Sequence, residues 1–224
     1  MKRIFEGAVY DMVKRTDGFV FSCRTEVFEG EMLMFYKTVD AQSGIIADVS
    51  NNIYLLAKFG ANYKSVIKPV SNIITAKTIS LPSGKLFLCD KDAGGKCYLF
   101  DGTGGILWTG VIQYRECVPS DIALYNNCVW ASFIEHNVLI RFNLATMREE
   151  LRIGGTRSPF SKPRSIFIEG NNAFVSNVGS YSLTKVNLDT YAVEDYCQFD
   201  RSVKSYLAVA DREYVLLDDG IYEL

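Results

Sequence analysis

Short apolar runs rich in β-branched and aromatic residues recur along the chain at similar intervals. Such runs, apolar at successive positions, are typical of strands that are buried on both faces of a sheet. They cover residues 19–22, 53–56, 86–89, 129–132, 174–176 and 214–217. We predict that each is the central strand of one structural unit.

A polar turn precedes most of these runs, and a second apolar run precedes the turn. The residues of the turns tolerate the positive φ angles of a two-residue hairpin. The turn dipeptides are Asp17-Gly18, Asn51-Asn52, Ser83-Gly84, Asn126-Asn127 and Asn171-Asn172. The strands upstream of the central ones are predicted at residues 8–10, 45–47, 78–81, 122–124, 166–168 and 206–209.

One unit occurs twice with a similar sequence, because the pattern of residues 120–144 is repeated in residues 164–188. The later central strands are 41–44 residues apart and the earlier ones 33–34. A period in this range, with several short strands per unit, is typical of a β-propeller blade. Four short strands need roughly 30 residues or more, so the first two blades are cramped and could be reduced to three strands. We predict an all-β propeller of six blades, with five as the alternative, that forms one domain over residues 1–224.

The two ends of the chain are predicted to complete one blade together. The blade that contains Val215 has one strand too few, and residues 4–6 form a short strand without an assigned place. Pairing of residues 4–6 with residues 221–223 would close the ring and remove two exposed edges. No long amphipathic helix is predicted, since the best helical stretch, residues 144–150, is too short to be stable alone.

Composition excludes several classes of protein. Lys and Arg number 24 against 26 Asp and Glu, without a basic or acidic run, which argues against nucleic-acid binding. No apolar stretch reaches the ~18 residues needed to span a bilayer, and Glu6-Gly7 interrupts any signal-peptide pattern. The six cysteines lack C-x-x-C spacing, so we expect reduced, structural thiols in a cytoplasmic protein.

The repeated motif carries a resemblance to a known family. Val118-Pro119-Ser120-Asp121-Ile122, then Cys128-Val129-Trp130, then Val138-Leu139-Ile140-Arg141-Phe142-Asn143 resembles the repeats of NHL-type propellers and streptogramin lyases. The similarity extends over residues 73–200 and implies the propeller fold rather than an activity. Streptogramin lyases use a histidine near an acidic cluster late in the chain. No histidine follows His136 here, so the resemblance does not imply that chemistry.

Several motifs have both a chemical and a structural interpretation. Glu135-His136 could serve acid–base catalysis, but it falls where a hairpin should turn, so we expect a solvated turn. The glycines of Gly94-Gly95 and Asp101–Gly105 could bind phosphate. No helix start follows either of them, so we expect hairpin turns.

A metal site is one hypothesis for Asp90, Asn177 and Asp218, which follow three central strands at equivalent positions. Oxygen ligands of this kind suit calcium or magnesium, and sugar-lactonase propellers hold a metal on their axis with Glu, Asn and Asp. The alternative is structural, because such side chains accept hydrogen bonds from the N–H groups of the next turn.

Charged residues lead into four of the innermost strands, at the mouth of the predicted central funnel. They are Lys77, Asp121, Arg164 and Lys204, and Tyr206 is expected at the floor. Mutual salt bridges across the funnel are the structural alternative. We predict a non-catalytic module that binds a protein partner or a small anionic ligand there, without a cofactor, nucleic acid or membrane. The alternative is a metal-dependent lyase or lactonase-like enzyme with Ca²⁺ or Mg²⁺ on the axis.

Overall fold

Strands account for every regular element in the part of the chain that the computed structural model describes. That part comprises residues 1–14, 19–25, 30–36, 44–49, 52–56, 68–69, 75–80, 86–90, 94–100, 106–209 and 211–224. No helix in these residues has the length and apolar character to cross a bilayer. The all-β prediction is therefore confirmed.

The described strands form four four-stranded and two three-stranded antiparallel sheets, which follow one another along the chain. The three-stranded sheets contain β2 (Val9–Lys14), β3 (Phe19–Thr25) and β4 (Gly30–Tyr36), and then β5 (Gly44–Val49), β6 (Asn52–Leu56) and β7 (Lys68–Pro69). The next three contain β8 (Thr75–Ser80), β9 (Leu86–Asp90), β10 (Lys96–Phe100) and β11 (Ile106–Val111); β12 (Asp121–Tyr125), β13 (Cys128–Phe133), β14 (Val138–Asn143) and β15 (Glu149–Gly154); and β16 (Pro163–Glu169), β17 (Asn172–Asn177), β18 (Ser182–Asn187) and β19 (Val193–Gln198). The last contains β20 (Ser205–Val209), β21 (Arg212–Leu217), β22 (Gly220–Glu223) and β1 (Lys2–Glu6).

Each predicted central strand is the second strand of its sheet, and each predicted upstream strand is the first. The hairpin at Asn126-Asn127 is confirmed, because both residues have positive φ (47° and 59°), as a type I′ turn requires. The next hairpin turns one residue earlier than predicted, at Gly170-Asn171, where Gly170 supplies the positive φ. The turns predicted at Asp17-Gly18, Ser83-Gly84 and Asp101–Gly105 lie outside the described residues.

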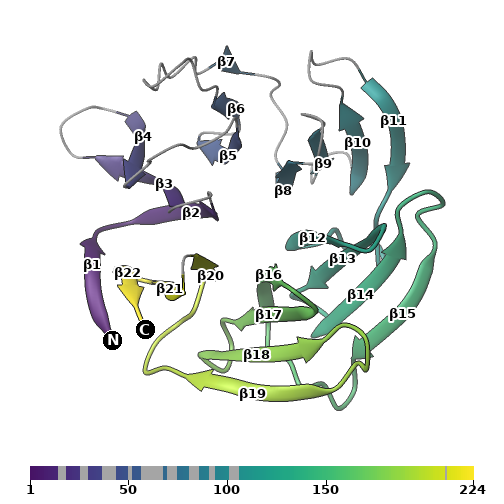
Figure 1. Ribbon diagram of the computed structural model, residues 1–224. Coiled ribbons are helices and arrows are strands. Elements are labelled where there is room, and N and C mark those ends of the chain that lie inside the picture. The colour runs from purple at the N-terminus through teal and green to yellow at the C-terminus, as the bar shows by residue number, and fades with distance from the viewer. Residues whose placement is uncertain are drawn as a thin grey trace.

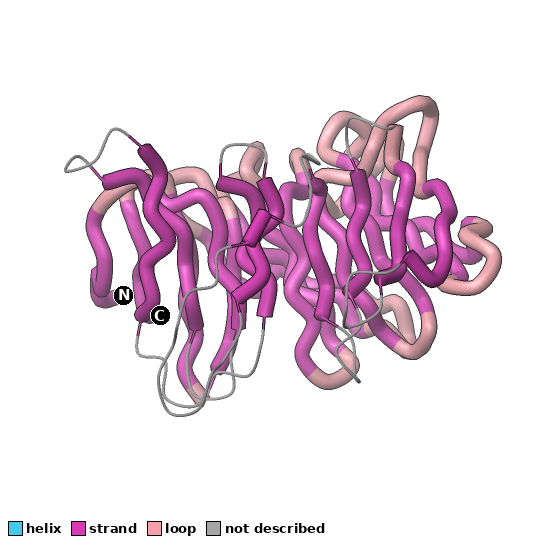
Figure 2. Tube along the Cα trace, turned by 90° about the horizontal axis from the view of Figure 1, so that it is seen from above, coloured by secondary structure: helices cyan, strands magenta, loops and turns pink. Residues whose placement is uncertain are grey.

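The sheets stand around a common centre, like the blades of a propeller (Figure 1). Their first strands contact one another in the cyclic order β2, β5, β8, β12, β16, β20 and back to β2. The strands run between two faces at which the loops gather (Figure 2). We call the face at which the innermost strands begin the top face, and the opposite face the bottom face.

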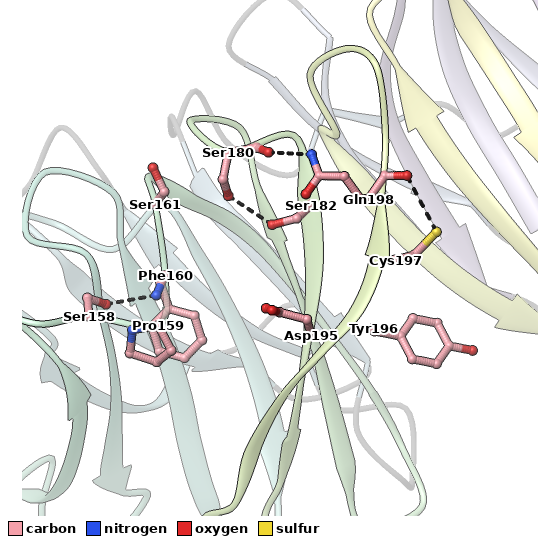
Figure 3. Close-up of a pocket in the computed structure, with 10 residues that line it drawn as sticks. All are labelled: Ser158, Pro159, Phe160, Ser161, Ser180, Ser182, Asp195, Tyr196, Cys197 and Gln198. Carbon is pink, nitrogen blue, oxygen red and sulfur yellow. Dashed lines mark hydrogen bonds between the residues drawn. The ribbon is translucent and has the colours of Figure 1, made fainter.

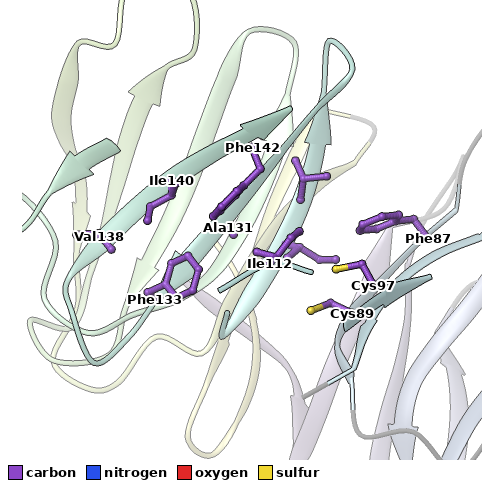
Figure 4. Packing of buried hydrophobic residues seen from close by; sticks show 11 residues of the cluster. Phe87, Cys89, Cys97, Ile112, Ala131, Phe133, Val138, Ile140 and Phe142 are labelled. Carbon is purple, nitrogen blue, oxygen red and sulfur yellow. The ribbon is translucent and has the colours of Figure 1, made fainter. Parts of the chain in front are cut away.

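The core consists of the layers between neighbouring sheets. One layer joins Phe87, Cys89 and Cys97 of the third sheet to Ala131 and Phe133 of the fourth (Figure 4). The next layer begins on the other face of the fourth sheet, where Trp130 meets side chains of β16 and β17. A sheet with apolar partners on both sides needs central strands that are apolar at successive positions, which explains the runs in the sequence.

The repeated motif has an Asn at the end of its third strand, and this Asn has a structural role. Asn143 Oδ1 accepts hydrogen bonds from the N–H groups of Ala145 and Thr146 (3.0 and 3.1 Å). One blade later, Asn187 Oδ1 accepts them from residues 189 and 190 in the same way. The repeated Asn therefore caps the bottom-face turn that leads to the outermost strand.

The terminal strands pair as the sequence predicts, since β1 lies beside β22 in the sheet that contains Val215. The register places Phe5 opposite Ile221 and Glu6 opposite Gly220. Ile221 is fully buried. A side chain at Gly220, whose φ is +153°, would come within 2.1 Å of the carbonyl oxygen of Phe5. Close approach of the two ends therefore requires a glycine at this position.

Deletion of residues 220–224 should lower the stability by at least about 3 kcal/mol, because it removes the buried Ile221 and exposes the edges of β1 and β21. Urea unfolding and sedimentation velocity would measure the loss and the expected aggregation. A chain that lacks only Leu224, which is exposed, is the control. Unchanged stability of the larger deletion would contradict a structural role of the terminal pairing.

Candidate functional site

The loop between β15 and β16 crosses the top face from one blade to the next, and Asn137 holds it in place. The Asn137 carbonyl accepts hydrogen bonds from Gly155 N (3.2 Å) and Ser158 Oγ (2.5 Å). Its side-chain Oδ1 accepts a third from Lys162 N at 2.6 Å. Loops fixed in this way on a rigid scaffold are common positions for binding groups.

Asn177, one of the predicted metal ligands, holds the same loop from the other side. Its side chain is fully buried, and Oδ1 accepts a hydrogen bond from Ser161 N at 3.2 Å. Nδ2 donates to Thr184 Oγ1 (2.9 Å) and to the Val175 carbonyl (3.2 Å). Because the amide already has protein partners at both atoms, the geometry supports its structural role.

Asp121, predicted at the funnel mouth, is a buried connection between two blades. Only 3% of the residue is exposed. Oδ1 accepts a hydrogen bond from Ile122 N and Oδ2 one from Ile166 N in the neighbouring innermost strand, both at 2.8 Å. The carboxylate thus satisfies backbone donors on β12 and β16, and we assign it to the fold rather than to a ligand.

Arg164 remains an exposed cation at the start of an innermost strand. The pairing of β16 with β17 passes from Pro163 to Ser165, so Arg164 is the extra residue of a β-bulge. Bulges of this kind redirect a side chain. Its guanidinium has no hydrogen bond or ion pair with any described residue.

Two further cations, Arg157 and Lys162, lie exposed on the same loop. Neither side chain has a carboxylate partner among the described residues. Sequence reasoning did not find them, because the loops between blades lie outside the repeated strand pattern. Their signal is local: the segment Arg157-Ser-Pro-Phe-Ser-Lys-Pro-Arg164 has three cations and no acid.

The two cations just before β20, Arg201 and Lys204, are paired, in contrast. Lys204 Nζ lies 3.2 Å from Asp218 Oδ1, so one predicted funnel residue and one predicted metal ligand form a salt bridge. Arg201 bonds to Asp200 (2.9 Å) and Asp219 (2.8 Å). The Tyr222 hydroxyl donates to Asp219 Oδ2, and this bond, more than the charge of Arg201, lowers the pKa of the Asp219 carboxyl.

Three other predicted site residues do not contribute a described, exposed side chain to the site. Lys77 lies on β8 and Asp90 ends β9, but their side chains lie outside the described residues. Tyr206 is 3% exposed and packs against Phe174 and Phe167, with ring centroids 4.8 and 5.6 Å away. Burial raises the pKa of its hydroxyl. Tyr206 is therefore part of a layer between two sheets.

His136 lies in the turn between β13 and β14, as predicted, but the turn is not fully solvated. The imidazole meets the Tyr114 ring edge-on at 5.1 Å, and its Nε2 is buried without a hydrogen-bond partner in the described part of the chain. No group of three or more His, Cys, Asp and Glu side chains that could hold a metal occurs among the described residues. The five cysteines with described side chains are free thiols.

A polar pocket of about 510 Å³ lies beside the crossing loop, between it and β19 (Figure 3). It is lined by residues 158–161, Ser180, Ser182 and residues 195–198. Most of its polar groups already bond within the protein, since Gln198 Nε2 donates to the Ser180 carbonyl (2.8 Å) and the two serine hydroxyls bond to each other (2.8 Å). Asp195 is its one ionic side chain, so the pocket itself does not suit an anion.

No protein-family model and no curated protein matches the chain. Solved structures do resemble it. Sqt1 of Saccharomyces cerevisiae is 12% identical, with 96% of this chain and 72% of that one covered and a TM-score of 0.55. BamB of Moraxella catarrhalis is 12% identical, covers 97% and 81%, and has a TM-score of 0.51. The computationally designed Ika8 protein is 10% identical, covers 97% and 71%, and has a TM-score of 0.55. Sqt1 and BamB are propeller proteins, so the likeness shows a propeller-type fold.

Replacement of Asp121 by Ala should destabilise the protein by about 2–4 kcal/mol, because two buried N–H groups lose their acceptor. Asp121→Asn, which keeps one carbonyl oxygen, should cost less. The matched control is Asp195→Ala, an exposed aspartate without a partner in the described structure, which should stay within about 0.5 kcal/mol of wild type in urea unfolding. Equal stability of the two alanine variants would contradict the structural assignment of Asp121.

Proposed function

We propose that the protein is a closed, six-bladed propeller of NHL-like repeats that acts as a binding module. Its ligand carries a carboxylate or phosphate group, either as a small molecule or on a protein partner, and binds at the top face around Arg164. The cyclic contacts of the innermost strands and the pairing of β1 with β22 support the closed ring. The capping of turns by Asn143 and Asn187 supports the repeat type.

The observation that carries this proposal is the exposed guanidinium of Arg164, which has no anionic partner among the described residues. Arg201 and Lys204, on the same face, have carboxylates within 3.2 Å. A planar guanidinium matches the geometry of carboxylate and phosphate groups with two parallel hydrogen bonds. Arg157 and Lys162 on the same fixed loop add positive charge, so an anion would meet a preorganised cationic surface.

At the bottom face, two innermost strands end in an ion pair. Lys14 Nζ lies 2.7 Å from Glu169 Oε1, which joins β2 to β16 although β20 lies between them in the ring. The same ammonium lies 5.4 Å from the centre of the Phe167 ring. These two innermost strands therefore end at the bottom face in a neutralised pair.

The metal-dependent alternative receives no support from the described side chains. A site of that class needs several oxygen ligands directed at one point, whereas Asn177 bonds within the fold and Asp218 pairs with Lys204. We therefore expect binding without a metal.

Replacement of Arg164 by Ala should weaken the binding of an anionic probe by about 1.5–3 kcal/mol, the range for a hydrogen bond to a charged group. Isothermal titration with inorganic pyrophosphate and with citrate would measure it, at constant ionic strength. Stability should change little, because the side chain is exposed. The control Arg148→Ala removes an exposed cation from the bottom-face turn after β14. Equal affinities of the two variants, or no binding by the wild type, would contradict the proposed site.

Millimolar Ca²⁺ or Mg²⁺ should leave the melting temperature of the metal-free protein unchanged. The reason is that the described residues contain no group of three or more His, Cys, Asp and Glu side chains that could bind the ion. Thermal shift after treatment with a chelator measures this directly. A reproducible rise of several degrees with either cation, lost in Asp218→Asn, would instead favour the metal-dependent alternative.

A further inference from the structure

The outermost strand of the third sheet, β11, presents an unprotected edge. Among the described strands it hydrogen-bonds only to β10, and it lies on the outer rim of the molecule (Figure 1). Its sequence, Ile-Leu-Trp-Thr-Gly-Val, contains no charged residue. Three of its side chains are well exposed: Ile106 (58%), Leu107 (51%) and Val111 (50%).

The other outermost strands of four-stranded sheets carry charges. β15 contains Glu149, Glu150 and Arg152, and β19 contains Glu194 and Asp195. The terminal strand β1 likewise has Lys2, Arg3 and Glu6. Charged side chains on an edge strand oppose pairing with another chain. Only β11, of these four edges, lacks this protection.

The absence of charge makes β11 suitable for pairing with itself. Two copies related by a two-fold axis perpendicular to the sheet would pair antiparallel, and each residue would then meet a residue of its own face. Had β15 paired in the same way about its fourth residue, Arg152 would have met Arg152 of the second copy. The register centred on Thr109 avoids any such conflict.

That register also brings complementary side chains together. Thr109 would meet Thr109 of the second copy, and Leu107 would meet Val111, which are both favourable cross-strand pairs. Trp108 would lie opposite Gly110, which has no side chain of its own. The Trp108 ring already lies over Gly110 of its own strand, since a Cβ at Gly110 would come within 2.5 Å of it. Leu107 is the extra residue of a bulge opposite Leu99 and Phe100, and the pairing of β11 with β10 is regular from Trp108 to Val111.

We propose that β11 is a self-association surface, through which two copies of this chain join their third sheets edge to edge. The pairing gives each β11 backbone a second hydrogen-bonded neighbour and covers Leu107 and Val111. This interface lies on the outer rim, whereas the proposed ligand site lies on the top face, so the two can be tested separately.

Sedimentation velocity over about 5–500 µM tests the association. The wild type should shift from monomer to dimer with concentration, and Thr109→Lys should weaken the dimer at least tenfold because two ammonium groups would meet at the axis. Thr190→Lys, the same change at an exposed threonine in the turn after β18, should behave as wild type. A wild type that stays monomeric, or a Thr109→Lys variant that dimerises as well as wild type, overturns the proposal.

A crosslink tests the register even if the dimer is weak. Residues directly opposite each other in an antiparallel pair are close enough for a disulfide. Thr109→Cys should therefore give a covalent dimer on copper-catalysed air oxidation, seen on a non-reducing gel, whereas Thr190→Cys should not. Failure of the Thr109→Cys variant to crosslink above the level of Thr190→Cys contradicts the Thr109-centred pairing.

Discussion

The architecture depends on one constraint: a sheet that is apolar on both faces needs a neighbour on both sides. Side chains of the fourth sheet take part in two different apolar layers, with Phe133 in one and Trp130 in the other. A row of such sheets would leave two apolar faces in water at its ends. Arrangement around a centre gives every sheet two neighbours, and the cyclic contacts of the innermost strands have this order.

Apolar layers do not fix the position of one blade against the next, and buried polar groups provide that precision. The carboxylate of Asp121 connects the backbones of two neighbouring innermost strands. Asn137 and Asn177 hold the crossing loop from two blades. Hydrogen bonds of this kind are directional, and leaving their donors unpaired in the interior would be costly. The same groups that align the blades therefore also fix the loop that carries Arg157, Lys162 and Arg164.

The strands were predictable from the sequence because their physical cause is local. Periodic apolar runs and hairpin residues such as Asn126-Asn127 specify secondary structure without knowledge of partners. The site was less predictable, because the role of a polar residue depends on neighbours that are distant in sequence. Asp121 and Arg164 are both charged residues at the start of an innermost strand. Yet Asp121 is buried and accepts a hydrogen bond from a backbone donor 45 positions away, whereas Arg164 lies at a bulge. No spacing rule separates these outcomes. The cations of the crossing loop were overlooked for a similar reason, since only the fold brings that loop beside the start of the innermost strands.

The central claim is that a fixed cationic loop at the top face receives an anion. Amide chemical shifts in a ¹⁵N-labelled sample, followed during titration with inorganic pyrophosphate, test this most directly because they locate the ligand without assuming a site. The account predicts saturable shifts concentrated in residues 155–164, with the turns at residues 144–148 and 188–191 of the bottom face unaffected. Shifts that are absent, do not saturate, or cluster at the bottom face would contradict it.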